Sequence, residues 1–130
     1  MIELLVVMAI LGVLAGAVMP LGESLLQSQR ERQLRQALWE IRGAIDEYKR
    51  AADRKWIATS ATDSGYPPSL DALANGVPDL RPESAGRRMY FLRTIPRDPM
   101  ADPSLPPELT WRLRSYASAP DRPRPGADVF

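Results

Sequence analysis

The sequence predicts an α+β protein in which one long N-terminal α-helix packs on a small antiparallel β-sheet. Three observations lead to this fold class. The start of the chain is almost wholly apolar, the next part alternates apolar and charged residues with a helical period, and twelve of the thirteen prolines lie after residue 58. We therefore expect three parts: residues 1–23, the apolar half of the helix; residues 24–57, its amphipathic half; and residues 58–130, a small α+β head.

Residues 4–22 carry no charge. A helix of that length rises about 28 Å, close to the roughly 30 Å hydrocarbon core of a bilayer. The first expectation is a transmembrane helix. A cleaved secretory signal is the alternative, because Ala15-Gly16-Ala17 resembles a cleavage site. No basic residue precedes the apolar run, however, and the run continues past that site to Leu21, which favours the membrane helix.

Apolar residues then recur at alternating steps of four and three, the period of a helix with one apolar stripe. No strong helix breaker lies between Glu23 and Trp56, so both halves are expected to form one helix of about 50 residues. The stripe is expected to form the protein core with the head. Its residues are Leu34, Leu38, Ile41, Ile45 and Tyr48.

The rest of the chain is expected to cover that stripe with short elements. The apolar runs 89–92 and 109–113 predict strands between turns. Residues 66–70 predict a turn into a short helix, with Ser69 as N-cap and with Leu70 and Leu73 facing inward. Residues 119–126 predict a loop. The three tryptophans, Trp39, Trp56 and Trp111, are interpreted as packing residues.

Composition argues against an enzyme. The chain has neither histidine nor cysteine, which removes the usual general base, the usual zinc ligands and the thiol nucleophile. No phosphate-binding loop is present, and no pair of carboxylates has a convincing spacing. With a net charge of +1, the arginine pairs 87–88 and 112/114 are expected to be solvated, and no nucleic acid partner is expected.

The opening Met1-Ile2-Glu3-Leu4-Leu5-Val6-Val7 resembles the N-terminus of type IV pilins and pseudopilins, in which a lone glutamate precedes an apolar helix. The resemblance extends to a proline seventeen residues later, Pro20, and to the small residues Gly12 and Gly16. It implies that Glu3 pairs with the free N-terminal amine of a neighbouring subunit. It also implies that Pro20 softens the helix and that the glycines allow close helix packing. The simpler interpretations are a juxtamembrane charge and an ordinary helix kink.

Two head motifs resemble the major pseudopilin of type II secretion: Tyr66-Pro67 after the long helix, and Pro96, Asp98 and Pro99 in a Pro-x-Asp-Pro loop. The resemblance implies a subunit that polymerises into a periplasmic filament and drives protein secretion. It places the chain in the bacterial inner membrane as a single-pass protein, with the N-terminus in the cytoplasm and the head in the periplasm. The implied partners are copies of the chain itself, other pseudopilins, a prepilin peptidase, an inner-membrane platform protein and the lipid bilayer.

The chain departs from the family pattern in two places. The family is made with a short basic leader and is methylated after cleavage, whereas Met1 already lies inside the motif, so we expect the native start to lie upstream. Major pseudopilins also often carry a calcium-binding loop beyond the point where this chain stops. No cofactor is identifiable from the residues; by resemblance calcium could bind, with Asp121 and Asp128 as its candidate contacts.

Two other functions stay open at this level. A type IV pilus or competence pilin would share the N-terminal motif and would serve adhesion, motility or DNA uptake. A monomeric, membrane-anchored periplasmic binding domain would share the helix but would not need Glu3 for assembly.

Overall fold

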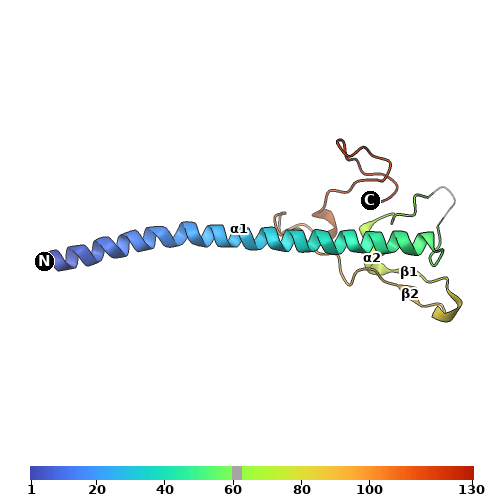
Figure 1. The fold of residues 1–130 in the computed structure, drawn as a ribbon, viewed down its shortest axis with the longest axis horizontal. Coiled ribbons are helices and arrows are strands. Elements are labelled where there is room, and N and C mark those ends of the chain that lie inside the picture. Colours follow the sequence, from blue (N-terminus) through green and yellow to red (C-terminus); the bar gives the residue numbers. More distant parts are fainter. Residues whose placement is uncertain (60–62) are drawn as a thin grey trace.

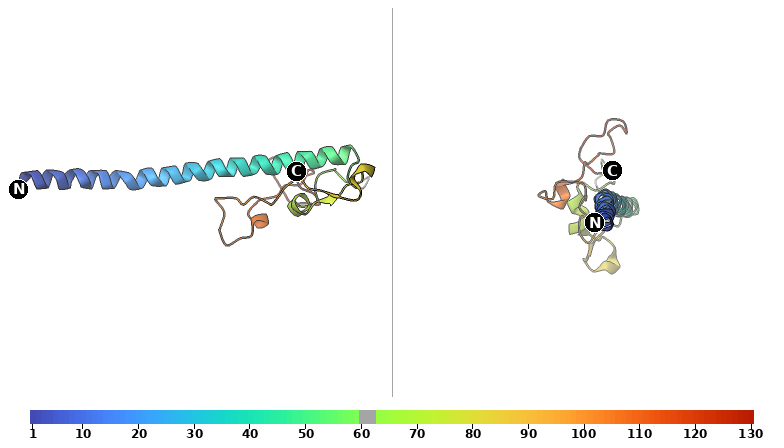
Figure 2. Two further views of the ribbon diagram at one scale, coloured as in Figure 1. Left: turned by 90° about the horizontal axis from the view of Figure 1, so that it is seen from below. Right: turned by 90° about the vertical axis from the view of Figure 1, so that its left-hand side faces the viewer.

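A computed structural model, which describes residues 1–59 and 63–130, shows one long helix with a head on one side of its second half (Figures 1 and 2). The α+β prediction is confirmed: an apolar N-terminal helix is followed by a short helix and a two-stranded antiparallel sheet. In chain order the elements are α1 (Ile2–Asp53), α2 (Leu70–Asn75), β1 (Val77–Pro78), a 3₁₀ turn η1 (Pro82–Ser84), β2 (Arg88–Met89) and a 3₁₀ turn η2 (Pro107–Leu109).

Helix α1 is continuous over 52 residues and contains Pro20. It curves gently in its first half rather than breaking there (Figure 1). The helix ends at Asp53, a turn before the predicted boundary at residue 57. Lys55 adopts a left-handed conformation with φ of 60°, and the Trp56 N–H donates to the carbonyl of Ala51 at 2.9 Å. A left-handed residue just after a helix stops its hydrogen-bond ladder in this way.

The core lies between the second half of α1 and the head. Ile41, Ile45 and Tyr48 of the stripe are buried, whereas Leu34 and Leu38 are only half-buried at the edge of the head. The stripe is wider than the sequence pattern indicated, because small residues share the buried face. The further buried apolar residues of α1 are Ala37, Ala44, Ala51 and Ala52, and the head contributes Ile57, Leu70, Leu73 and Val129.

Helix α2 forms where it was predicted. Ser69 occupies the N-cap position without a side-chain hydrogen bond, and Leu70 and Leu73 point into the core with exposed fractions of 3% and 0%. Gly76 then turns the chain into β1 with φ of 79°. A Cβ atom at Gly76 would lie 2.9 Å from the carbonyl oxygen of Met89, so both the conformation and the close approach require glycine.

The sheet is shorter than predicted. Val77 pairs with Met89 and Pro78 with Arg88, so the predicted strand 89–92 keeps only its first residue. The N–H groups of Phe91 and Leu92 instead both donate to the carbonyl of Leu73 in α2, at 3.1 and 3.0 Å. These two N–H groups are thus paired with a carbonyl of α2 rather than with a strand, and the strand ladder ends at Met89.

The prediction of a strand over 109–113 is wrong. Residues 107–109 form the turn η2, and residues 110–114 are irregular. The N–H groups of Leu109 and Thr110 donate to the carbonyls of Pro106 and Pro107, at 3.0 and 3.2 Å, and are therefore not available to a strand ladder. The segment is held by side chains instead: Trp111 packs against the core, and its indole Nε1–H donates to the carbonyl of Pro96 at 2.7 Å.

The packing role predicted for Trp39 is also wrong. Its side chain is 78% exposed. At 3.6 residues per turn, Trp39 lies about 200° around α1 from Ile41, on the side of the helix away from the head. Trp56 and Trp111 are half-buried and do pack against the core.

Candidate assembly surface

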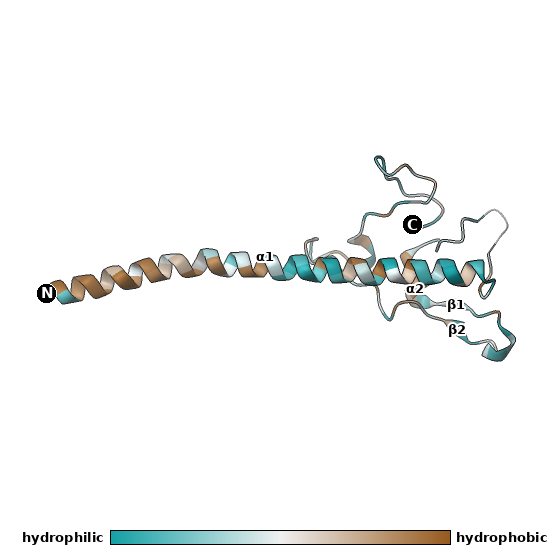
Figure 3. Ribbon diagram, viewed as in Figure 1, coloured by the Kyte–Doolittle hydropathy of each residue, from teal (hydrophilic) through white to brown (hydrophobic). Residues whose placement is uncertain are grey.

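The first half of α1 is covered by no other part of the chain within the described residues, 1–59 and 63–130. Its large apolar side chains up to Leu21, outside the undescribed side chain of residue 19, are 49–78% exposed. Figure 3 shows this half as a nearly continuous apolar cylinder that gives way to polar residues near the head. Removing such a side chain from water is favourable by a free energy of about 1.5–3 kcal/mol. A surface of this kind needs lipid or other helices around it.

Glu3 lies in the first turn of α1, at the far end from the head, and is exposed. The helix N-terminus favours its negative charge. Along α1 the first basic side chain is Arg30, about 40 Å away at 1.5 Å per residue. Residues 4–29 of the same helix therefore offer Glu3 no cationic side chain. A cation that pairs strongly with Glu3 in a membrane or a filament has to come from elsewhere.

Gly12, Gly16 and Pro20 follow Glu3 along the same bare segment. A Cβ atom at either glycine would meet nothing within 4 Å, so these positions leave room on the helix surface for another backbone. Pro20 has no N–H to donate to the carbonyl of Gly16, yet the helix runs through it. The structure thus gathers all four assembly candidates on one uncovered half-helix.

By length and composition, α1 could cross a membrane; a signal sequence near an N-terminus meets the same criterion. The apolar helix has the length and composition of a membrane anchor or of a signal segment.

The head motif Tyr66-Pro67 lies where the C-terminal residues return to the head. The Tyr66 ring stacks on Tyr116 with 5.2 Å between centroids and forms a T-shaped pair with Phe130 with 4.9 Å between centroids. Pro67 is buried, and its carbonyl accepts a hydrogen bond from the N–H of Val129 at 2.7 Å. These two residues join the entrance of the head to its end.

The second head motif holds a different loop. The carbonyl of Pro96 accepts from Trp111, as described above, and the N–H of Asp98 donates to the Thr110 hydroxyl at 3.1 Å. One Asp98 carboxylate oxygen also accepts from the N–H of Met100 at 2.9 Å. Pro99 is half-buried beside them. The motif therefore closes the base of the segment 98–110 in the head, whereas Glu3 and Pro20 lie on the bare half of α1.

Asp128 has a structural role that the sequence did not reveal. It accepts hydrogen bonds from the Ser64 hydroxyl and from the N–H of Tyr116, the latter at 3.0 Å. Asp121 is 78% exposed and lies 4.0 Å from Arg122. Residues 1–59 and 63–130 contain no group of three or more carboxylates that could hold a metal ion. Asp121 and Asp128 as they lie here do not fit a calcium site.

A second cluster that sequence reasoning missed fixes the end of α1 to the sheet. The Arg81 guanidinium and backbone N–H donate to the Asp79 carboxylate, with the Nη2–Oδ2 distance 2.7 Å. The guanidiniums of Arg54 and Arg81 both lie over the Trp56 ring, 4.8 and 4.7 Å from its centroid. The hydrogen bonds from Arg81 lower the pKa of Asp79 below its ordinary value.

We expect the stabilising effect of Asp79 to depend on pH. Because its pKa is lowered in the folded state, the effect is present above the ordinary aspartate pKa of about 4 and is lost as the pH falls through the folded pKa. Thermal unfolding midpoints of the native chain and Asp79→Asn, measured from pH 7 to pH 3, should converge on acidification. Asp121→Asn, in an exposed loop, is the control. A difference for Asp79→Asn that stayed constant to pH 3 would contradict the assignment.

Comparison with protein-family models gives no match, and no curated protein and no solved structure is detectably similar to the chain. A long apolar N-terminal helix followed by a small antiparallel sheet is consistent with a pilin-like architecture.

Proposed function

We propose that this chain is a non-catalytic subunit that polymerises through α1 into a pilin-like filament. The observation that carries the proposal is the bare first half of α1, an apolar surface that the head leaves uncovered from end to end. In the inner membrane lipid would cover it. In a filament the same surface would be covered by the α1 helices of neighbouring subunits.

Three details of this surface support assembly over simple anchoring. Glu3 places a carboxylate at the apolar end, where it is costly unless a partner neutralises it. Gly12 and Gly16 open the helix surface to close approach, and Pro20 frees the backbone carbonyl of Gly16 within the apolar half. A plain anchor needs none of these.

Within the pilin-like class, we propose the major pseudopilin of type II secretion, acting in a periplasmic pseudopilus. The support is the resemblance of Tyr66-Pro67 and of Pro96, Asp98 and Pro99 to that family, together with their place in the head. The first motif joins two parts of the head by ring contacts and a hydrogen bond, and the second closes the base of a loop by hydrogen bonds. Copies of the chain, other pseudopilins, a prepilin peptidase and a platform protein would then be its partners, and the head would lie in the periplasm.

Crosslinking in membranes tests assembly. The chain has no cysteine, so Val6→Cys and Leu14→Cys in one chain supply the only thiols, at positions 51% and 57% exposed. We expect oxidation to give a ladder of multimers, and Glu3→Ala to reduce the multimers more than about tenfold, equivalent to about 1.4 kcal/mol. The loss is expected because the intersubunit partner of the carboxylate is left unpaired.

Glu23→Ala is the matched control. It removes the other acidic residue of the first half of α1, near its polar end, and should leave the ladder intact. If only monomer formed in every variant, the chain would be a membrane-anchored periplasmic binding domain rather than a filament subunit. If the ladder formed equally with Glu3→Ala, assembly would stand but the pairing of Glu3 would be refuted.

A further inference from the structure

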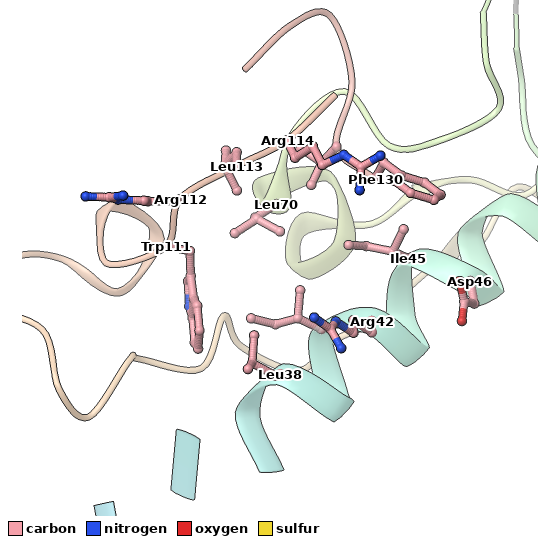
Figure 4. A pocket seen from close by; sticks show the side chains of 12 residues that line it. Leu38, Arg42, Ile45, Asp46, Leu70, Trp111, Arg112, Leu113, Arg114 and Phe130 are labelled. Atoms are coloured by element: carbon pink, nitrogen blue, oxygen red, sulfur yellow. The ribbon is translucent and has the colours of Figure 1, made fainter. Parts of the chain in front are cut away.

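A groove lies between α1 and the segment 111–114. Its volume is about 470 Å³, within the size range of pockets that bind ligands or side chains of a partner. Figure 4 shows Trp111 and Leu38 facing each other at one end and Phe130 at the other. The apolar lining includes Leu38, Ile41, Ile45, Leu70 and Leu113.

The charged groups around this groove are mostly positive. Arg42, Arg112 and Arg114 line it, and Asp46 is the acidic residue among the lining side chains. The Nε–H of Arg114 is buried and has no hydrogen-bond acceptor among the described residues. The groove suits an apolar side chain accompanied by a carboxylate.

A segment of complementary chemistry projects from the same head. Residues 98–110 stand out from the head toward the bare half of α1 (Figure 2). Met100, Leu105 and Leu109 in this segment are 48%, 37% and 64% exposed. Its own ionisable residues are acidic, Asp98, Asp102 and Glu108, and they outnumber the one cation held against the segment, Arg97.

The projecting segment is already ordered. Arg97 donates to the carbonyls of Asp102, at 3.1 Å, and Leu105, and the Asp102 carboxylate accepts from the N–H of Ser104 at 2.9 Å. The Thr110 hydroxyl donates to the carbonyl of Pro107 at 2.6 Å. An ordered loop loses little conformational entropy when it binds. Glu108 and Leu109 lie side by side on its turn η2 and are both exposed.

We infer that the groove of one subunit receives Glu108 and Leu109 of a second copy of this chain. Leu109 would enter the apolar floor beside Leu38, and the Glu108 carboxylate would meet the arginines of the rim. Charge complementarity selects this occupant, because the groove is basic and the projecting segment acidic. In the filament each subunit would receive Leu109 from one neighbour and insert its own Leu109 into another, a head-to-tail contact that extends into an open filament when the rotation between subunits does not close a ring. The inference rests on the proposed filament and adds a contact between heads.

Two differently tagged full-length chains, produced together, test this contact. One carries Leu109→Cys and the other Leu38→Cys or, as a second probe on the exposed rim, Arg42→Cys. Oxidation should join the two tags. Glu108→Arg in the first chain should reduce that product more than tenfold, and Arg112→Glu in the second should restore it. Leu80→Cys, at 55% exposure, replaces Leu109→Cys as the control and should give no product.

The outcomes separate this inference from the proposed function. If Leu109 joined neither groove probe while the Val6 and Leu14 ladder persisted, the groove contact would be wrong and the filament would stand. If both products were missing, both proposals would fail. Linkage of two Leu109→Cys chains to each other in place of the groove product would indicate a symmetric contact and would overturn the head-to-tail arrangement. Failure of Arg112→Glu to rescue Glu108→Arg would refute the charge pairing.

Discussion

Leu73→Ala is expected to lower the free energy of unfolding of the head by about 2–5 kcal/mol, a large share of the 5–15 kcal/mol typical of a folded domain. Leu73 has an exposed fraction of 0% and lies on α2 where that helix meets the core. Truncation would leave a cavity beneath the carbonyl that accepts from Phe91 and Leu92. Urea unfolding of the full chain in detergent, followed by tryptophan fluorescence, measures the change.

Leu80→Ala is the matched control for that experiment. Leu80 is 55% exposed beyond β1, so its truncation should change stability by no more than about 0.5 kcal/mol. Equal effects of the two variants would mean that α2 does not form part of the core as described.

Leu11→Arg should release the chain from membranes. Leu11 lies in the middle of the bare half of α1 and is 59% exposed. An arginine at the centre of a membrane helix costs about 2.5–3.5 kcal/mol on insertion scales. We expect roughly a hundredfold shift toward the soluble fraction, measured by sedimentation of membranes after an alkaline wash.

Two variants control for charge and for truncation in that measurement. Gln27→Arg adds the same charge to the polar part of α1 and should stay with the membrane, as should Leu11→Ala. The near-ultraviolet circular dichroism of the head should be unchanged, because Leu11 does not contact it. Retention of Leu11→Arg at the native level would exclude the bare half of α1 as the membrane-covered surface.

The helices were predictable because their signals are local. The apolar run and the four-three spacing predicted α1, and the Pro-Pro-Ser sequence before Leu70 predicted the start of α2. The alanines of the buried face gave no signal, since alanine occurs as readily on an exposed helix surface. Trp39 was misplaced because a large apolar side chain near the stripe was assumed to be buried.

The strands and head contacts depend on residues far apart in the chain. Phe91 and Leu92 are residue types that favour strands, but their N–H groups donate to the carbonyl of Leu73 in α2 and not to a neighbouring strand. The hydrogen bond of Asp128 to Ser64 spans 64 residues, and no sequence spacing indicates it. In contrast, the candidates Glu3, Gly12, Gly16 and Pro20 came from a contiguous motif, and their common exposure on one helix follows from that continuity.

The way the head is attached to α1 determines how it would respond to mechanical load. The sheet pairs only two residues on each strand, whereas the buried residues of α1 extend from Ala37 to Ala52. A force pulling along the axis of α1 would therefore act in shear across several turns of side-chain contact at once, rather than opening one strand pair after another. Resistance to such a pull would come from the simultaneous loss of those contacts, so the head should remain folded while the subunit is drawn out of a bilayer.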